Sequence, residues 1–296
     1  MWILAVLSLV FAYAQTTEPA TGWQARTLEY DGLTRTYSVY VPATADDPAP
    51  LVIALHPAGA SGRDMALISR FNELADPSGW LVAYPDGPGG YWDYGAGTPE
   101  WEDVPDLRDD PGFIAAMIEA IDAEWMVDRE RIYAAGYSNG ARMAHRLACE
   151  LPLAGVAMAA ATLSDEVTKS CKDGIVAVWM QHGTADSVVP FDGDPDLTIG
   201  SLRISRALSV IETAQFYALR NGCDNPTFDT VFEFNEVVRV RLDLVRYQDC
   251  AQGSAVEVLV ADGGGHGWTH VPTVDTSALI WGFFEQHTLI VPAAEE

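Results

Sequence analysis

The segment from Arg131 to Cys149 constrains the fold of this chain more than any other. Residues 132–135 form a short β-prone apolar run that ends at Gly136-Tyr137-Ser138-Asn139-Gly140, a G-x-S-x-G pattern, and helix-forming residues follow. A strand, a sharp turn and a helix in this order hold a strained serine with its hydroxyl above the strand ends. The free N–H groups of the helix would then face developing negative charge. The alternative is a glycine-rich turn that happens to contain a serine, and the rest of the chain decides between them.

Predicted strands alternate with predicted helices along most of the chain. Strands are expected at 26–30, 35–41, 51–55, 80–84, 132–135, 154–163, 175–180, 237–247 and 255–260. Helices are expected at 64–74, from a cap at Asp110 onward, after Ser138, at 203–220 and at 277–287. The pattern predicts one α/β domain over residues 15–296, with a mostly parallel central sheet, helices on both faces and no separate lid domain. Ligand chemistry is then expected at the carboxyl ends of the strands.

A serine hydroxyl needs a base to take its proton and a carboxylate to orient that base. In the α/β-hydrolase fold these residues follow strands in the chain order Ser, Asp, His. Asp186 follows the strand at 175–180, and His266 follows the strand at 255–260 behind three glycines. We therefore predict a triad of Ser138, Asp186 and His266.

Other residues compete for these roles. Asp192, Asp194 and Asp196 are further from the strand end than Asp186, and His270 lacks the glycine approach of His266. Two more histidines, His56 and His182, follow strands directly, where a histidine more often bonds backbone carbonyls, and His145 on the helix after Ser138 is expected to be a surface or packing residue.

The oxyanion hole is expected to use two backbone N–H groups. One belongs to Asn139, which follows the nucleophile, and the other to the loop after the strand at 51–55. Because Pro57 has no N–H, Ala58 is the first choice and Gly59 the second. Five aromatic residues are candidates for a substrate cleft, although buried aromatics could equally anchor the loops: Tyr91, Trp92, Tyr94, Trp101 and Trp268.

The chain resembles secreted polyhydroxybutyrate depolymerase-type esterases and their feruloyl esterase relatives. The likeness runs from about Arg35 to Trp268 through LHPAGASG, YPDG, DDPGF, VDRERIYAAGYSNGARMAHRLAC, HGTADSVVPF and DGGGHGW, in that order. It implies an α/β-hydrolase fold, the triad named above, and Ala58 and Asn139 as oxyanion donors. The usual His-Gly before the oxyanion residue is here His56-Pro57, and the sequence after His266 also departs from the family pattern, so the pocket wall there can differ.

The compartment is predicted from the N-terminus and the cysteines. Residues 3–12 are apolar but too few to span a bilayer, and Ala12-Tyr13-Ala14 forms a cleavage site, so residues 1–14 are expected to be a secretory signal peptide. Four cysteines in an oxidising compartment allow three disulfide pairings. Proximity in sequence suggests Cys149 with Cys171 and Cys223 with Cys250, and the family resemblance favours the same pairs. The protein is thus expected to be secreted, extracellular or periplasmic.

Charge and composition narrow the partners. Asp and Glu total 42 against 17 Lys and Arg, which argues against nucleic acid because its binding depends on cationic side chains. No carboxylates, histidines or cysteines recur at metal-ligand spacing, so neither a metal nor another cofactor is expected. We expect a monomer without a membrane partner that acts on an ester substrate, either a small molecule or a polymer chain end.

These observations predict a serine esterase that forms an acyl-enzyme. Feruloyl-type, short hydroxyalkanoate and aryl polyester substrates are expected. An acetyl xylan esterase-like carbohydrate esterase is the enzymatic alternative, and a catalytically silent binding protein on the same scaffold is the alternative from another class.

Overall fold

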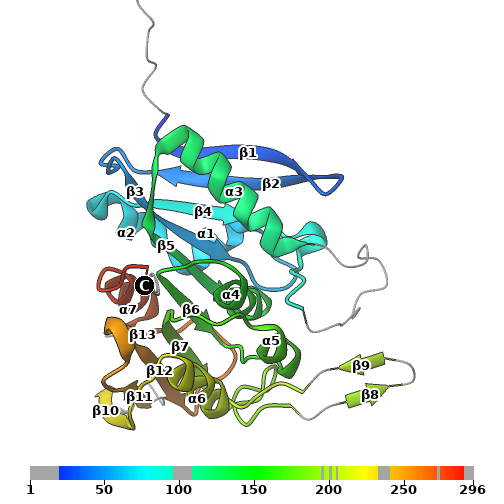
Figure 1. Ribbon diagram of the computed structural model, residues 1–296, viewed down its shortest axis with the longest axis vertical. Helices are drawn as coiled ribbons and strands as arrows, with labels where there is room; N and C mark the ends of the chain where they lie inside the picture. The colour runs from blue at the N-terminus through cyan, green and yellow to red at the C-terminus, as the bar shows by residue number, and fades with distance from the viewer. Residues whose placement is uncertain are drawn as a thin grey trace, which may run out of the picture.

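The computed structural model describes residues 20–95, 109–194, 197–199, 202–204, 206–232, 241–271 and 274–289. Within them, ten strands form one sheet in the order β1-β2-β4-β3-β5-β6-β7-β12-β11-β10 (Figure 1). The strands are β1 (Gly22–Tyr30), β2 (Leu33–Val41), β3 (Ala49–Leu55), β4 (Leu81–Pro85), β5 (Val127–Tyr137), β6 (Gly155–Ala159), β7 (Ala177–Gly183), β10 (Pro226–Phe232), β11 (Arg241–Tyr247) and β12 (Val256–Asp262). The six central strands from β4 to β12 are parallel. At one side of them β2 and β1 are added, and at the other side β11 and β10, each through antiparallel pairing with its neighbour.

The apolar runs of the sequence become the middle of this sheet. Every residue of β3, β4, β6 and β7 is buried, as expected when helices cover both faces of parallel strands. The β1–β2 hairpin pairs Tyr30 with Leu33 across Asp31 and Gly32, whose φ angles are 50° and 73°. Two positive φ values in a two-residue loop match the right-handed twist of a hairpin.

Helices cover both faces of the sheet. α3 (Asp110–Trp125), α4 (Asn139–Glu150) and α6 (Val210–Arg220) contribute to the core on one face. α1 (Gly62–Ser69), α2 (Phe71–Ser78) and α7 (Thr276–Phe284) contribute to the core on the other. Figure 1 shows α3 lying across the face turned to the viewer, and α5 (Asp165–Ser170) beside α4. The predicted α/β-hydrolase architecture, a mostly parallel sheet between two helical layers, is confirmed.

Several element boundaries differ from the predictions. The helix expected at 64–74 is two helices, because Arg70 adopts a left-handed conformation with φ 53° and its N–H caps α1 at Ala66. The helix expected at 203–220 begins only at Val210, where Ser209 and Glu212 form a capping box. Asp109, rather than Asp110, caps α3.

The structure also contains short elements that the sequence patterns did not predict. They are α5, β10, the hairpin of β8 (Leu197–Ile199) and β9 (Leu202–Ile204), the pair β13 (His270–Val271) and β14 (Val274–Asp275), and the 3-10 turns η1 (Pro88–Gly90) and η2 (Ala251–Gly253). Two of the three β9 residues, Arg203 and Ile204, lie inside the segment that was expected to be helical. None of the helices in the described ranges combines the length and apolar character needed to cross a bilayer.

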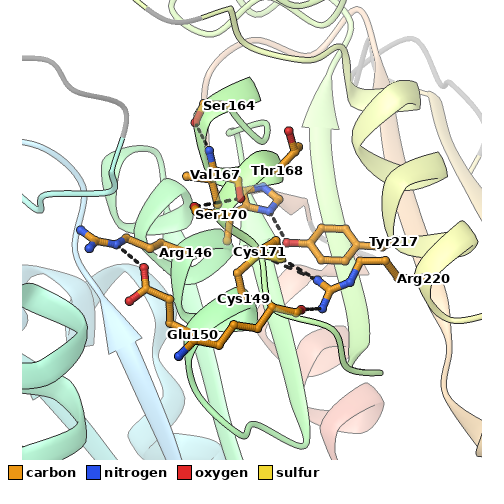
Figure 2. Close-up of a disulfide and its surroundings, with 12 residues drawn as sticks. Arg146, Cys149, Glu150, Ser164, Val167, Thr168, Ser170, Cys171, Tyr217 and Arg220 are labelled. Carbon is orange, nitrogen blue, oxygen red and sulfur yellow. Dashed lines mark hydrogen bonds and ion pairs between the residues drawn. A yellow bond between two sulfur atoms is a disulfide. The ribbon is translucent and has the colours of Figure 1, made fainter.

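Two disulfides join segments on one side of the fold. Cys149 at the end of α4 bonds Cys171, which follows α5, and Cys223 after α6 bonds Cys250 before β12. Figure 2 shows the first of these bridges with the Arg220 guanidinium beside it, where Nη1 lies 2.7 Å from the Cys171 sulfur. The observed connectivity is one of the three that the sequence allowed, and it is the one that proximity and the family resemblance favoured.

Candidate active site

Ser138 occupies a strained turn between β5 and α4. Its φ of 55° and ψ of −117° are unfavourable for a residue with a Cβ, and such strain persists only when the surroundings fix it. The flanking glycines explain how the turn closes. A Cβ on Gly136 would lie 2.2 Å from the Gly140 carbonyl oxygen, and a Cβ on Gly140 would lie 2.2 Å from that of Leu55. Glycine is therefore required at both positions by close backbone approach.

In the predicted triad, His266 lies within hydrogen-bonding distance of both Ser138 and Asp186. His266 Nε2 is 2.9 Å from Ser138 Oγ, and His266 Nδ1 is 2.8 Å from Asp186 Oδ2. Ser138 follows β5, Asp186 follows β7 and His266 follows β12, so three strand ends deliver the group to one edge of the sheet. This arrangement can take a proton from the serine hydroxyl and stabilise the imidazolium that results.

Asp186 is held as a carboxylate by its surroundings. It is 6% exposed, and its Oδ1 accepts the N–H groups of Val188 at 2.8 Å and Val189 at 2.9 Å. Burial by itself would raise the pKa of Asp186, but the two N–H donors and the His266 ring outweigh it, so the pKa lies below its ordinary value. The two valine amides were not predicted from the sequence, although an Asp in a turn often binds backbone N–H groups that follow it.

Two backbone N–H groups were predicted to form an oxyanion hole near Ser138. Asn139 is the first residue of α4, so its N–H has no acceptor inside that helix. Ala58 is exposed, and its N–H has no acceptor within the described part of the chain. The Gly59 N–H, by contrast, donates to the Gly90 carbonyl at 2.8 Å. Of the two positions considered in this loop, Ala58 is therefore the one whose donor is free.

Most of the predicted cleft aromatics are buried. Trp92 is 2% exposed and Trp268 is 8% exposed, and the indole N–H of Trp268 donates to Ser277 Oγ at 3.0 Å. Tyr94 is also buried, and its hydroxyl accepts from Arg142 Nη1 at 2.9 Å. Tyr91 alone among the four described candidates is half-buried, and Trp101 lies outside the described residues. The arrangement favours loop anchoring, the alternative considered for this cluster, at Trp92, Tyr94 and Trp268.

A further aromatic residue borders the site. Tyr137, immediately before the nucleophile, is half-buried, and its ring centroid lies 5.4 Å from that of His266. Tyr137 was not among the predicted site residues, although the variable position before the serine of G-x-S-x-G always adjoins that serine. Tyr137 therefore packs beside the His266 imidazole.

The two other histidines near strand ends, His56 directly after β3 and His182 as the second-last residue of β7, contact backbone carbonyl groups. His56 Nδ1 lies 2.8 Å from the Pro57 carbonyl oxygen and His182 Nδ1 lies 3.2 Å from that of Gly183, which confirms the expected carbonyl contacts. Burial lowers the pKa of both rings, so they are held neutral. His182 Nε2 is 3.8 Å from Asp186 Oδ2, too long for a hydrogen bond.

His145 is a packing residue rather than a surface residue. It is 1% exposed, and its Nδ1 lies 3.0 Å from the Tyr217 hydroxyl oxygen. Burial lowers the pKa of His145 to about 3. The imidazole is therefore neutral at neutral and mildly acidic pH.

The described residues do not meet the requirements of a metal site. Within the described ranges, no group of three or more His, Cys, Asp or Glu side chains is arranged to hold a metal ion. The fold, with a serine, a histidine and an aspartate at its strand ends, defines the α/β-hydrolase class.

The family model for Esterase PHB depolymerase matches residues 35–196, more than half of the chain. The protein belongs to this family. It is a carboxylic ester hydrolase.

Curated relatives extend the likeness beyond the matched domain. "Putative esterase NocK" of Nocardia uniformis subsp. tsuyamanensis is 30% identical over 258 residues, which cover 82% of this chain and 73% of that protein. "Feruloyl esterase B" of Piromyces equi is 28% identical over 258 residues, covering 83% of this chain and 44% of that protein. "Bifunctional acetylxylan esterase/xylanase XynS20E" of Neocallimastix patriciarum is 23% identical over 263 residues, covering 89% of this chain and 35% of that protein. The chain thus spans less than half the length of the latter two.

Among solved structures, the acetyl xylan esterase from Aspergillus awamori has a similar fold. Its TM-score is 0.60 at 15% identity, and the alignment covers 88% of this chain and 98% of that one. At this identity the likeness concerns the fold alone.

Proposed function

We propose that this protein is a secreted serine esterase that cleaves carboxylic esters through Ser138, His266 and Asp186. The observation that carries the proposal is the continuous chain of contacts from Asp186 Oδ2 to His266 and from His266 Nε2 to Ser138 Oγ, at 2.8 Å and 2.9 Å. The strained backbone of Ser138 supports the same role, because strain of this kind is concentrated at functional sites.

The geometry supports a two-step reaction. His266 Nε2 takes the Ser138 proton as Oγ attacks the ester carbonyl carbon, and the N–H groups of Ala58 and Asn139 bind the resulting oxyanion. When the intermediate collapses, His266 gives that proton to the departing alcohol and an acyl-enzyme remains. A water molecule deprotonated by His266 then attacks the acyl carbon. This second step releases the carboxylic acid and restores Ser138.

The names of the relatives support two acyl classes. Feruloyl esterases would favour an aromatic acyl group, whereas the bifunctional relative and the Aspergillus awamori enzyme would favour acetyl groups on xylan. The family match supports short hydroxyalkanoates. We propose aryl polyesters as a further substrate class. Initial rates on methyl ferulate, acetylated xylan, 3-hydroxybutyrate oligomers and an aryl polyester would rank these classes directly.

The decisive test of the serine mechanism is Ser138→Ala. Because triad members act as a unit, the activity of the variant on p-nitrophenyl acetate and butyrate should fall by about 10⁴-fold or more. Its melting temperature should stay close to that of the wild type. A folded variant with a substantial fraction of the activity would reject Ser138 as nucleophile. A wild-type protein without activity on any ester would favour a silent binding protein.

Secretion rests on two features. Disulfides persist mainly in oxidising compartments, and the structure contains two of them. The proposed signal peptide, residues 1–14, lies outside the described residues. N-terminal sequencing of the exported protein should begin at Gln15, and retention of residues 1–14 in the mature protein would reject the cleavage site.

A further inference from the structure

The two proposed oxyanion donors belong to chain segments that leave different strands. Ala58 lies in the loop after β3, whereas Asn139 is the first residue of the helix after β5. Transition-state stabilisation by such donors depends on their spacing and direction, because they must meet one oxygen atom simultaneously. The residues that fix the spacing of these segments therefore matter for the reaction even where they do not touch the substrate.

Trp92 bonds to both segments. On one side, its backbone N–H donates to Asn139 Oδ1 at 2.8 Å and its carbonyl oxygen accepts from Asn139 Nδ2 at 3.3 Å. On the other side, its indole N–H donates to the His56 carbonyl oxygen at 3.0 Å. His56 is two residues before Ala58, so the bond is made next to the loop that offers the second donor.

The indole ring is held in one place by its surroundings. Trp92 is 2% exposed, and its ring centroid lies 4.9 Å from that of His56. The His56 ring in turn fixes the neighbouring backbone: Nε2 accepts the Gly87 N–H at 2.9 Å, while Nδ1 faces the Pro57 carbonyl oxygen. Both ring nitrogens are therefore engaged, which holds the His56 ring and the loop before Ala58 in place. The ring contact between His56 and Trp92 then holds the indole against that loop.

The segment of Trp92 is also attached to the body of the protein. The next residue, Asp93, donates its N–H to Asp110 Oδ2 at 2.7 Å. Asp110 is itself completely buried and pairs with the buried Arg35, with Nη2 and Oδ1 2.8 Å apart. Trp92 is thus braced from α3 and β2, and can act as a fixed support for the two donor segments.

We propose that Trp92 is a positioning residue for ester hydrolysis, which sets the spacing of the Ala58 and Asn139 amides through its three hydrogen bonds. The inference rests on the proposed function. It gives Trp92 a role in aligning the oxyanion hole in place of the substrate contact that its sequence position suggested.

The first test is Trp92→Phe, which keeps an aromatic ring and removes the indole N–H. Because misplaced donors weaken binding of the transition state more than of the substrate, kcat on p-nitrophenyl butyrate should fall about 10-fold with KM within about twofold. A trifluoromethyl ketone forms a serine adduct whose oxyanion occupies the hole. Its inhibition constant should rise by about the same factor as kcat falls.

The second test removes the Asn139 end of the Trp92 bridge, the hydrogen-bonded link that Trp92 makes between the two donor segments. Asn139→Ala deletes the side chain that holds Trp92 but keeps the backbone N–H that is proposed to bind the oxyanion. It should produce the same pattern in kcat and in the inhibition constant. The double variant should lose less activity than the product of the two single losses, because both substitutions break one bridge.

Trp281→Phe is the matched control. Trp281 on α7 is also buried, at 4% exposed, but its indole N–H has no acceptor in the described ranges. The substitution removes the same atoms from the core on the opposite face of the sheet. Both kcat and the inhibition constant should match those of the wild type.

The outcomes separate the possibilities. A folded Trp92→Phe with unchanged kcat and inhibition constant rejects the inference, and so does a raised KM at unchanged kcat, which would indicate direct substrate contact. If Trp92→Phe does not fold, Asn139→Ala decides alone, and wild-type kinetics there reject the bridge. If the wild type and Ser138→Ala hydrolyse esters equally, the proposed function itself is wrong and the inference falls with it.

Discussion

Replacement of the buried His145 should make the protein less sensitive to mild acid. The imidazole has a pKa near 6.5 in the unfolded chain, and burial lowers its pKa to about 3 in the folded protein. Between pH 6.5 and pH 3 the unfolded state therefore binds a proton at His145 that the folded state does not bind. Since stability falls wherever the unfolded state binds more protons, His145 contributes a penalty that grows as the pH falls from 6.5 toward 3.

The size of the penalty follows from the two pKa values. Each pH unit in this window costs about 1.4 kcal/mol per proton, so at pH 5 the single imidazole should lower the free energy of unfolding by about 2 kcal/mol relative to pH 7.5. His56 and His182 are also buried with lowered pKa values, and they act in the same direction. The His145 contribution is isolated by substitution.

Equilibrium urea unfolding at pH 7.5 and pH 5.0, at one ionic strength, provides the measurement. His145→Asn should lose about 2 kcal/mol less than the wild type between these pH values. Tyr217→Phe is the matched control, because it removes the hydroxyl that contacts His145 Nδ1 but leaves the titrating imidazole. An equal pH-dependent loss in His145→Asn and the wild type would refute the reasoning, as would an NMR titration showing that His145 protonates above pH 5.

Two further predictions concern the acid of the triad and the disulfides. Asp186→Asn should lower kcat/KM by about 10⁴-fold in a p-nitrophenyl ester assay, because the amide cannot hold the required tautomer of His266, whereas Asp192→Asn, at an exposed position, should be nearly neutral. The reverse ranking would assign the acid to the later loop. Each disulfide closes a segment of 22 or 27 residues, and its removal should cost about 3 kcal/mol of stability. Loss of Cys223–Cys250, which adjoins the strand that delivers His266, should also lower kcat, whereas loss of Cys149–Cys171 should affect mainly the melting temperature; equal effects on kcat would contradict this division.

The central part of the fold could be predicted because local pattern and tertiary environment agree there. Strands covered on both faces need continuous apolar residues, so β3, β4 and β7 were recognisable, and the glycines around Ser138 marked a turn that only close backbone approach explains. The boundaries were predicted less well. Arg70 interrupts a helical pattern through a left-handed conformation, and the residues of β9 carry an apolar pattern that helices share.

The sequence by itself determined the class of the fold, because the central strands of an α/β sheet need continuous apolar runs. It also predicted Ser138, Asp186 and His266 as the candidate site, because they follow such runs in the order that an α/β-hydrolase requires. Tertiary structure decided which groups meet. Trp92 was a candidate for a substrate cleft from its sequence, yet the structure buries it between the Asn139 side chain and the His56 carbonyl oxygen. The hydrogen bonds from the valine amides to Asp186 and the buried ion pair of Arg35 and Asp110 could likewise not be predicted from the sequence. Contacts of this kind join residues tens of positions apart or use backbone atoms that every residue has, so no local pattern specifies them, and they exist only once the sheet has brought its strand ends together.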